Sequence, residues 1–468
     1  MSGRPRFSVV IPTRERARTL AFSLATCLEQ GFDDYEVLVC DNCSAPATRE
    51  VVEAAASPRV RYVRAPEPLA MRDNWELAVA EARGEFIIVL GDDDGLMPYA
   101  LAELDGLIER LGARVIRWTA AFYTWPDVAL PGQGDYLRLP LGRRLRMLEA
   151  PEVIASVIRF EAPYIMLPML YNSAIHRDLI AELRQRGGRV FANAYPDVYS
   201  GFALAYLAGR YPSIDVPMTV AGSSGDSYGL ATLFLRGASE RDRDLRVLDA
   251  KGKVPRHRWS SDFPVFPAVP VADSFQMAKE ALFPGDDRLT LDRQLVTTHC
   301  IYGLRVQTEP EWWQARGSIR ASLEDDPALI RWFDDTLGGV TPTLERMRLR
   351  PDALGYDGEF LHLDTKAFGA ADVRAVVALA ATILNHRAGA IDYAETVAPA
   401  SPEMAEGLAE PQVGEHALFR LLVRFIGTKS AVKGALLRRR IAAKPSPSDR
   451  WLTVAGRARA WVRSRLGD

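Results

Sequence analysis

Three consecutive carboxylates, Asp92, Asp93 and Asp94, follow an apolar run over residues 86–90 and are separated from it by Gly91. Adjacent negative charges repel each other, at a cost of roughly 4 kcal/mol per pair about 4 Å apart in a medium of effective dielectric constant near 20. A divalent cation removes that cost, and carboxylates together with substrate phosphates are usual ligands of Mg²⁺ or Mn²⁺. The triplet therefore indicates a metal site that also receives phosphate. The alternative is an acidic, solvated turn.

The apolar run before the triplet predicts a strand that is buried on both faces. It is short, rich in β-forming residues and bounded by Gly84 and Gly91, which favours a strand over a helix. Strands of this kind belong to parallel sheets covered by helices. Such sheets bind ligands beyond the carboxyl ends of their strands, so the triplet lies where a ligand is expected.

Strand and helix patterns alternate over the first 118 residues. Strands are expected over 7–11, 35–40, 60–63, 85–90 and 115–118, and helices over 17–28, 47–56, 75–82 and 98–111. This order predicts an α/β domain in which a parallel sheet lies between helices. Polar residues follow three of the strands, at positions 12–15, 41–42 and 92–94. They would converge on one edge of the sheet.

Three segments of the chain resemble the family 2 glycosyltransferases of the GT-A fold. They are Val-Val-Ile-Pro-Thr-Arg at 9–14, Val-Leu-Val-Cys-Asp-Asn-Cys-Ser at 37–44 and Gly-Glu-Phe-Ile-Ile-Val-Leu-Gly-Asp-Asp-Asp-Gly-Leu-Met-Pro at 84–98, and Asn74 and Trp75 also fit. The resemblance covers roughly residues 5–225. It implies an inverting hexosyltransferase (EC 2.4) of polysaccharide biosynthesis. The donor would be a nucleotide-sugar, with a UDP-sugar favoured, and the acceptor a hydroxyl of a glycan or lipid-linked molecule.

The resemblance also implies roles for residues that bind the nucleotide-sugar. Asp41, with Asn42 beside it, matches the Asp that holds the base. Arg72 is placed to touch the diphosphate, the alternative being a solvated charge at the start of a helix. The first nucleotide-binding loop is matched by Pro12, Thr13, Arg14 and Glu15.

The resemblance implies that the triplet binds the cofactor, which would be Mn²⁺ or Mg²⁺. Asp93 matches the metal-binding Asp, and Asp92 matches its neighbour, which binds the ribose or the metal. Asp94 is the third candidate ligand. The family more often has an Asp where this chain has Gly91, so the division of roles among the three carboxylates stays open.

Asp197 precedes apolar residues at helical spacing, which places it at the start of a helix. By itself this pattern predicts an N-cap. The resemblance implies more, because the family carries an acidic base here, usually as Glu-Asp. Pro196 replaces the Glu and Asp197 matches the Asp, which would be the catalytic base. The helix dipole is expected to keep the carboxylate ionised and ready to accept a proton.

The rest of the chain has weaker signals. Residues 119–150 have a loop composition with aromatic side chains that either stack on a sugar or pack. The Gly/Ser stretch 221–225 is either a lid or a linker. Beyond it the pattern is mainly helical, and its scattered histidines form no catalytic group. We predict a GT-A domain over 1–225, a mainly α-helical region over 226–416 and a basic tail over 417–468.

The tail carries 13 Lys and Arg residues against two acidic ones, Asp449 and Asp468. Its apolar residues fall on helical faces opposite the basic ones, a pattern typical of helices at an anionic membrane surface. The alternative is a helix packed on the body. With no apolar run long enough to span a bilayer, the expected location is the cytoplasm, with peripheral attachment to the inner face of the cell membrane if the tail binds lipid.

Composition excludes several classes. The hydrophobic fraction of 48% and charged fraction of 25% are those of a soluble globular protein. A net charge of −2 argues against nucleic acid as a partner. The four cysteines are too few for a disulfide framework, and Cys40 and Cys43 are interpreted as incidental thiols. Two other functions remain: a sugar nucleotidyltransferase, disfavoured because no Gly-rich phosphate loop follows the first strand, and a non-catalytic nucleotide-sugar-binding or membrane-docked scaffold protein.

Overall fold

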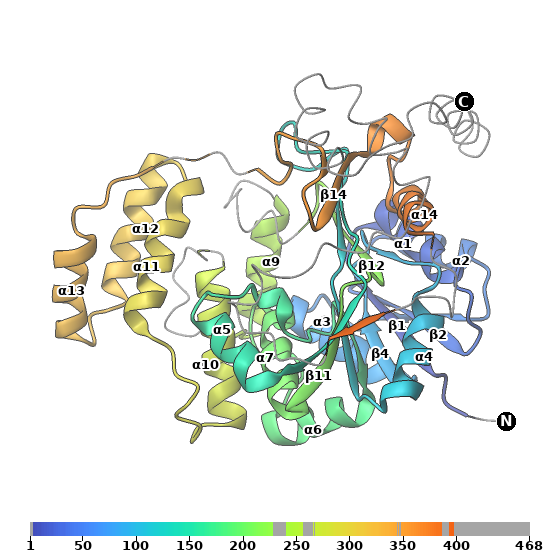
Figure 1. The fold of residues 1–468 in the computed structure, drawn as a ribbon, viewed down its shortest axis with the longest axis horizontal. Helices are drawn as coiled ribbons and strands as arrows, with labels where there is room; N and C mark the ends of the chain where they lie inside the picture. Colours follow the sequence, from blue (N-terminus) through green and yellow to red (C-terminus); the bar gives the residue numbers. More distant parts are fainter. Residues whose placement is uncertain are drawn as a thin grey trace, which may run out of the picture.

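A mixed sheet with helices on both faces forms the centre of the molecule (Figure 1). The computed structural model describes residues 3–227, 240–255, 265, 267–343, 345, 348–385 and 393–396. In this part of the chain the sheet has nine strands: β1 (Phe7–Thr13), β2 (Tyr35–Asp41), β3 (Val60–Arg64), β4 (Phe86–Val89), β6 (Val115–Trp118), β9 (Arg144–Glu149), β10 (Ser173–His176), β11 (Arg210–Ile214) and β15 (Ala394–Thr396). Their order is β15-β9-β11-β6-β10-β4-β1-β2-β3.

Strands β1 to β4 form the parallel part of the sheet that the sequence predicts. Thr13 at the end of β1 lies opposite Asp41 at the end of β2, and Val10 lies opposite Val89 of β4. The carboxyl ends of these strands therefore share one edge, which we call the rim. The sheet is not parallel throughout, because β10 is antiparallel to both of its neighbours, β4 and β6.

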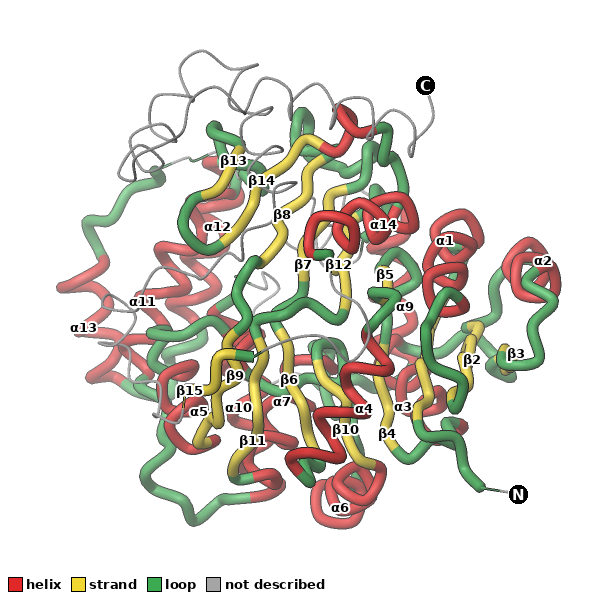
Figure 2. The backbone as a smooth tube through the Cα atoms, turned by 45° about the vertical axis from the view of Figure 1, so that its right-hand side comes forward, coloured by secondary structure: helices red, strands yellow, loops and turns green. Residues whose placement is uncertain are grey.

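A smaller sheet stands beyond the rim (Figure 2). Its order is β13-β14-β8-β7-β12-β5, with the strands β5 (Gly95–Leu96), β7 (Ala121–Thr124), β8 (Tyr136–Pro140), β12 (Thr219–Ser223), β13 (Gly355–Tyr356) and β14 (Phe360–Asp364). The expected loop over 119–150 is therefore wrong, since β7, β8 and β9 lie within it. Tyr123, Trp125 and Tyr136 are buried there, so these aromatic rings pack in the core.

The alternation of side chains along the strands builds two cores, one on each face of the main sheet. Val9 and Ile11 pack on one side, whereas Val10 packs on the other. The first core is covered by α1 (Ala17–Leu28), α4 (Ala100–Leu111) and α14 (Val373–Leu384), and α2 (Pro46–Ala54) lies beside α1. The second core is covered by five helices: α3 (Met71–Glu81), α5 (Ala150–Ile158), α6 (Arg177–Gly187), α7 (Pro196–Ala208) and α10 (Ala268–Leu282).

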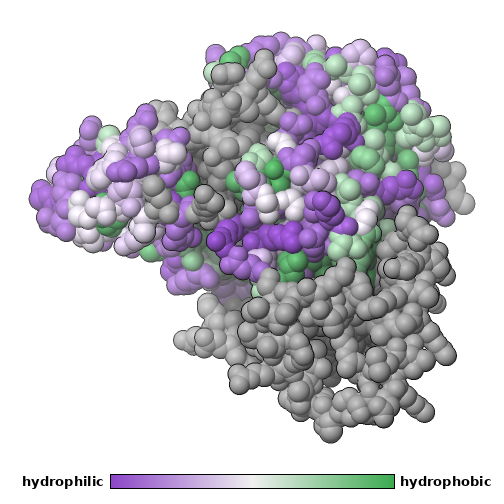
Figure 3. Space-filling view, turned by 90° about the horizontal axis from the view of Figure 1, so that it is seen from above, coloured by the Kyte–Doolittle hydropathy of each residue, from purple (hydrophilic) through white to green (hydrophobic). Residues whose placement is uncertain are grey.

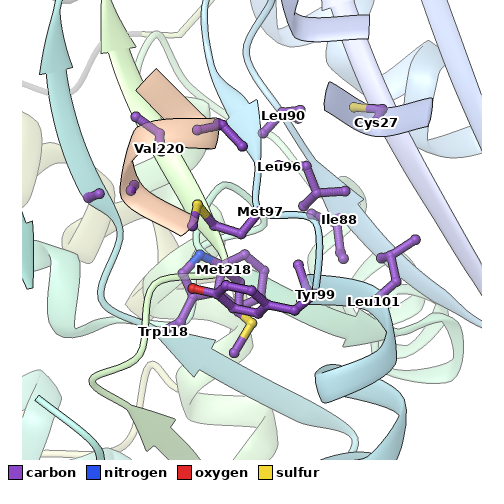
Figure 4. Packing of buried hydrophobic residues seen from close by; sticks show 14 of the residues in the cluster. Cys27, Ile88, Leu90, Leu96, Met97, Tyr99, Leu101, Trp118, Met218 and Val220 are labelled. Atoms are coloured by element: carbon purple, nitrogen blue, oxygen red, sulfur yellow. The ribbon is translucent and has the colours of Figure 1, made fainter. Parts of the chain in front are cut away.

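The two sheets share the first core. Figure 4 shows Met97, Tyr99, Trp118 and Met218 packed together where the chain passes from one sheet to the other. The polar atoms of the large rings are satisfied there: the Tyr99 hydroxyl donates to the carbonyl of Pro217 at 2.8 Å, and the Trp118 indole donates to the Thr219 hydroxyl at 2.8 Å. This packing fixes β12, which ends at the rim.

A helical lobe with its own apolar core extends from the body. It contains α11 (Arg293–Gly303), α12 (Glu309–Ala321) and α13 (Pro327–Leu337), and its outer surface is mostly hydrophilic (Figure 3). The remaining elements are α9 (Glu240–Lys251) and the 3₁₀ turns η1 (Tyr164–Met166), η2 (Leu304–Val306) and η3 (Thr365–Phe368). After the lobe the chain returns to the body, where β14 pairs with β8 and α14 packs on α1.

Within the described residues, no helix has the length and apolar character needed to cross a membrane. The basic tail over 417–468, with the membrane prediction made for it, lies outside the described residues, as do His257, His386 and His416.

Candidate functional site

The rim brings together the polar strand ends that the sequence singled out. The Thr13 hydroxyl donates a hydrogen bond to Oδ2 of Asp92 at 2.6 Å, and the backbone N–H of Asn42 donates to the carbonyl of Thr13 at 2.9 Å. Asp41, Asp92, Asp93 and Asp94 are all buried. Three separate strands thus place their terminal residues in one small polar region.

Arg16, which precedes α1, is the cation that contacts the triplet. Its Nη1 lies 3.0 Å from Oδ1 of Asp92, and its Nη2 lies 2.5 Å from Oδ2 of Asp93 and 2.5 Å from the Ser224 hydroxyl. The three charged side chains are between 6% and 9% exposed. Burial alone would lower the pKa of Arg16, but the charges of Asp92 and Asp93 more than offset this and raise it. A fixed positive charge therefore compensates two of the three carboxylates.

Backbone N–H groups compensate the third carboxylate. Asp94 accepts hydrogen bonds from the N–H of Gly222 at 2.6 Å and from the N–H of Gly91 at 2.9 Å. Burial, followed by the charge of Asp93, raises the pKa of Asp94 to about 7. The stretch 221–225, expected to be a lid or a linker, therefore completes β12 and holds the triplet, with Ser224 also donating to Asp93.

Replacing Gly222 by alanine should destabilise the triplet. A Cβ at Gly222 would lie 1.9 Å from the carbonyl oxygen of Asp93, so the backbone must move, at an expected cost of about 1–3 kcal/mol in the free energy of unfolding. Urea denaturation measures this. Gly106→Ala is the matched control, because its Cβ would meet nothing within 4 Å in the middle of α4 and alanine favours a helix. Equal midpoints for the two variants would contradict the packing argument.

The base-binding candidate Asp41 is held on all sides by the protein. It is 0% exposed, and its carboxylate accepts from the Tyr62 hydroxyl at 2.6 Å, from Arg64 at 2.6 Å and from the backbone N–H of Ser44 at 2.9 Å. The side chain of Asn42 forms two hydrogen bonds with the backbone of Leu69. Both groups are therefore fixed in orientation at the rim.

The first-loop candidates lie beside these groups. Pro12 is buried in β1 opposite Cys40. Arg14 donates to the carbonyl of Asn42 at 2.7 Å and pairs with Asp244 of α9 at 2.9 Å. Glu15 has a positive φ of 55°, and its carboxylate accepts from the N–H of Ala45 at 2.9 Å. The loop after β1 thus links β2 and α9.

Arg72 is embedded between two segments of the chain. Its guanidinium donates to the carbonyls of Ala192 and Gly252 at 2.8 and 2.9 Å and lies 3.3 Å from Asp73. Its side chain is 7% exposed, and burial lowers its pKa. In this arrangement Arg72 ties the segment before α7 to the segment after α9.

Asp197 lies in the first turn of α7, at the helix start that the sequence predicts, but the N-cap is Tyr195 and the N-cap interpretation is wrong. Tyr171 is influenced both by Asp197 and by the triplet. Burial comes first among the causes that raise the pKa of Tyr171, followed by the charges of Asp94 and Asp93, a hydrogen bond with Asp94 and the charge of Asp197. Tyr171 also stacks on Trp75 at 6.4 Å between ring centroids. The charge of Asp197 therefore acts on Tyr171, the side chain that forms a hydrogen bond with Asp94.

The pKa of Asp197 shifts in the direction opposite to the one expected from the helix dipole. Burial raises its pKa, although the N–H groups of Val198 and of Asp197 itself act in the opposite direction. Burial therefore outweighs the helix terminus. A raised pKa makes the carboxylate a stronger base.

Asp92 and Asp93 fit a hard divalent cation in donor type. Their oxygens already face one positive charge, that of Arg16, and Mg²⁺ or Mn²⁺ prefers carboxylate and phosphate oxygens. Asp94 fits less well because it faces N–H donors. Among the described residues, no group of three or more His, Cys, Asp or Glu side chains could hold a metal ion, so a bound cation would take further ligands from a substrate.

Sequence reasoning missed several residues of this region. Arg16 ends the Pro-Thr-Arg-Glu-Arg segment, and its place just before the predicted helix gave no hint of its partners. Ser224 and Gly222 lie about 130 positions from the carboxylates they contact. Tyr171 follows Leu170 in a stretch without a motif, so nothing in the sequence could have indicated it.

Comparison with known proteins gives a family match and several distant relatives. Residues 8–162 match the model of glycosyl transferase family 2. The succinoglycan biosynthesis protein ExoO of Rhizobium meliloti is 30% identical over 111 residues, which are 24% of this chain and 32% of that protein. The GalNAc(5)-diNAcBac-PP-undecaprenol beta-1,3-glucosyltransferase of Campylobacter jejuni is 31% identical over 103 residues, 21% and 33% of the two chains. The matches thus span about a third of these relatives.

Two solved structures are similar at low identity. Staphylococcus aureus TarS in complex with UDP-GlcNAc has a TM-score of 0.39 and 15% identity, covering 68% of this chain and 83% of that one. The mannosyltransferase PcManGT from Pyrobaculum calidifontis, in complex with GDP-Man and Mn²⁺, has a TM-score of 0.35 and 15% identity, covering 82% and 89%.

Proposed function

We propose a specific activity for this chain, which belongs to glycosyl transferase family 2 and has its GT-A type of α/β fold. It moves a hexose, with inversion, from a nucleotide-diphosphate donor, a UDP-sugar being favoured, to a hydroxyl of a glycan or lipid-linked acceptor in polysaccharide biosynthesis. The observation that carries the proposal is the convergence of Thr13, Asp41 and the triplet on one edge, with the charge of Asp197 acting on Tyr171, which forms a hydrogen bond with Asp94. The names of the two curated relatives, one a succinoglycan protein and one acting on an undecaprenol-linked glycan, support this acceptor class.

In this proposal each group of rim residues has a separate role. Asp41 and Asn42 orient the base, and the loop from Pro12 to Glu15 lies beside the nucleotide. Asp92 and Asp93 would hold Mn²⁺ or Mg²⁺, which supplies positive charge for the departing nucleoside diphosphate when it is bound. Asp94 keeps the triplet in place through its bonds to backbone N–H groups.

Asp197 acts on the acceptor. Its carboxylate, made more basic by burial, accepts the proton of the acceptor hydroxyl as the oxygen attacks the anomeric carbon on the face opposite the leaving diphosphate. The bond from that carbon to the diphosphate breaks in the same step, through an oxocarbenium-like transition state. Tyr171, which stacks on Trp75, forms a hydrogen bond with Asp94 and is influenced by the charge of Asp197.

Thermal unfolding with candidate donors tests the proposed activity. UDP-, GDP- and dTDP-sugars are added with Mn²⁺ or with EDTA, and a donor at 100 times its Kd should stabilise the protein by about 2.7 kcal/mol. One nucleotide series should raise Tm with Mn²⁺ and much less with EDTA, and the active donor should then release its nucleoside diphosphate. Asp92→Asn is the matched variant. No shift with any sugar nucleotide would rule out the proposal.

We further propose the division into a catalytic domain over 1–225, a supporting region over 226–416 and a membrane-docking tail over 417–468, with the enzyme peripheral on the inner face of the cell membrane. The excess of Lys and Arg in the tail supports this. Co-sedimentation of full-length protein and residues 1–415 with anionic liposomes tests it, and equal binding of the two would refute the role of the tail.

A further inference from the structure

A cavity of about 940 Å³ lies at the amino ends of β1 to β4, on the edge of the sheet opposite the rim. In Figure 2 this is the end of the sheet nearest the N-terminus. Guanidinium groups dominate its lining, which includes Arg4, Arg59, Arg61, Arg83 and Arg177. Its volume is in the range of sites that bind small molecules, and none of the roles proposed above involves it.

The two carboxylates in the lining are already engaged. Glu36 accepts from the Ser8 hydroxyl at 2.6 Å, from the N–H of Arg83 at 2.7 Å and from Arg61 at 2.8 Å. Despite burial, these bonds lower the pKa of Glu36. Arg61 also lies 4.0 Å from Glu81. Arg61 therefore contacts both carboxylates, and the five arginines of the lining outnumber these two negative charges.

The remaining positive charges have little compensation. Among the described residues, Arg4, Arg83 and Arg177 have no carboxylate within 4.0 Å. Arg177 donates to the carbonyl of Ala82 at 3.0 Å, but its buried Nε has no partner. Burial, followed by the charge of Arg4, lowers the pKa of Arg177, and the charges of Asp178 and Glu36 offset this only in part. Arg59 pairs only with Asp33, whose side chain is 97% exposed, so that pair contributes little.

We propose that this cavity binds a small soluble anion that carries a diphosphate group. Guanidinium groups present a planar fork of N–H donors that matches phosphate oxygens. Three of them around one cavity, without carboxylate partners, suit more than one phosphate group. The cavity is larger than a single phosphate requires, so the ligand also carries an organic part. The site is separate from the proposed donor site because the full length of the strands lies between them.

Binding of inorganic diphosphate, measured calorimetrically in EDTA at constant ionic strength, tests this proposal. The double variant R4Q/R83Q removes two exposed side chains that have no ion pairs. Its diphosphate affinity should fall by at least about tenfold, while its affinity for the sugar nucleotide with Mn²⁺ stays unchanged. The control is R49Q/R288Q, which removes two exposed arginines outside the cavity.

Two outcomes would overturn the proposal. One is the absence of saturable diphosphate binding by the wild-type protein. The other is an equal loss of affinity in both double variants, which would indicate a general charge effect. Failure of the sugar nucleotide to bind, with diphosphate binding still sensitive to R4Q/R83Q, would refute the glycosyltransferase activity and leave this site standing.

Discussion

Asp197→Asn is expected to retain sugar-nucleotide binding and to lose about 10²–10⁴ in the rate of transfer. The amide keeps the size of the side chain but cannot accept the proton of the acceptor hydroxyl. Binding of the donor is spared because the nucleotide contacts proposed for this enzyme lie on β1, β2 and the triplet. Single-turnover kinetics with saturating donor measures the step directly, and equilibrium titration of the donor measures the binding.

The pH dependence of the stability and of the transfer rate distinguishes a catalytic base at Asp197 from a residue that only stabilises the start of the helix. Because burial raises the pKa of Asp197, the unfolded chain ionises at a lower pH than the folded one, and the carboxylate lowers stability as pH rises above the ordinary Asp range. Asp197→Asn should therefore be at least as stable as the wild type at pH 7. The wild-type transfer rate should rise with pH through the raised pKa, and the variant should lack that rise.

Asp178→Asn is the matched control, since Asp178 also lies in the first turn of a helix, α6, with its side chain 75% exposed. It should lose at most about 1 kcal/mol of stability and none of the transfer rate. If Asp197→Asn transfers sugar at the wild-type rate, or if it unfolds more readily than Asp178→Asn, then Asp197 only stabilises the start of the helix and the base lies elsewhere.

The rim was predictable because it follows from patterns within short segments of the sequence. Apolar runs lead into Thr13, Asp41 and Asp92. Each run predicts a strand, and the polar residue after it marks where that strand reaches the rim. Residues 8–162 match the model of the predicted family, and the observed sheet confirms the predicted α/β fold class. The strands of the second sheet were harder to predict. The segment between β7 and β8 is rich in Gly and Pro, although these two strands pair with each other, and the other partner of β8 is β14, more than 200 residues away.

The finer structure of the site was hidden for a related reason. The sequence shows where a carboxylate stands in the chain, but not which group compensates its charge in the folded protein. Asp94 is compensated by the N–H of Gly222, and Asp93 by Arg16 and Ser224. These partners depend on where β12 returns to the rim, and this is set by packing around Trp118 and Met218. The chemistry of the triplet could be predicted, but its division among three carboxylates could not.

Arg16→Gln is expected to destabilise the protein in EDTA by about 3–5 kcal/mol, because it removes the cation between two buried carboxylates. Mn²⁺ should restore much of this loss in the variant and far less in the wild type. The double variant R16Q/D92N removes one charge of each sign and should be more stable in EDTA than R16Q alone. Urea denaturation with and without Mn²⁺ measures all three, and R18Q, which removes an arginine whose side chain is 58% exposed on the same helix, is the control.

The same substitution should also tighten the binding of Mn²⁺. In the wild type, Arg16 would compete with the ion for Asp92 and Asp93, and the apparent affinity would be the intrinsic affinity multiplied by the fraction of molecules in which the guanidinium is displaced. If that fraction is about one tenth, R16Q gains about tenfold in affinity, which titration of free Mn²⁺ by electron paramagnetic resonance would detect without any donor. Unchanged or weaker Mn²⁺ binding in R16Q would mean that Arg16 does not compete with the ion. The two carboxylates would then be a permanent partner of the arginine, and the proposed metal site would have to be given up.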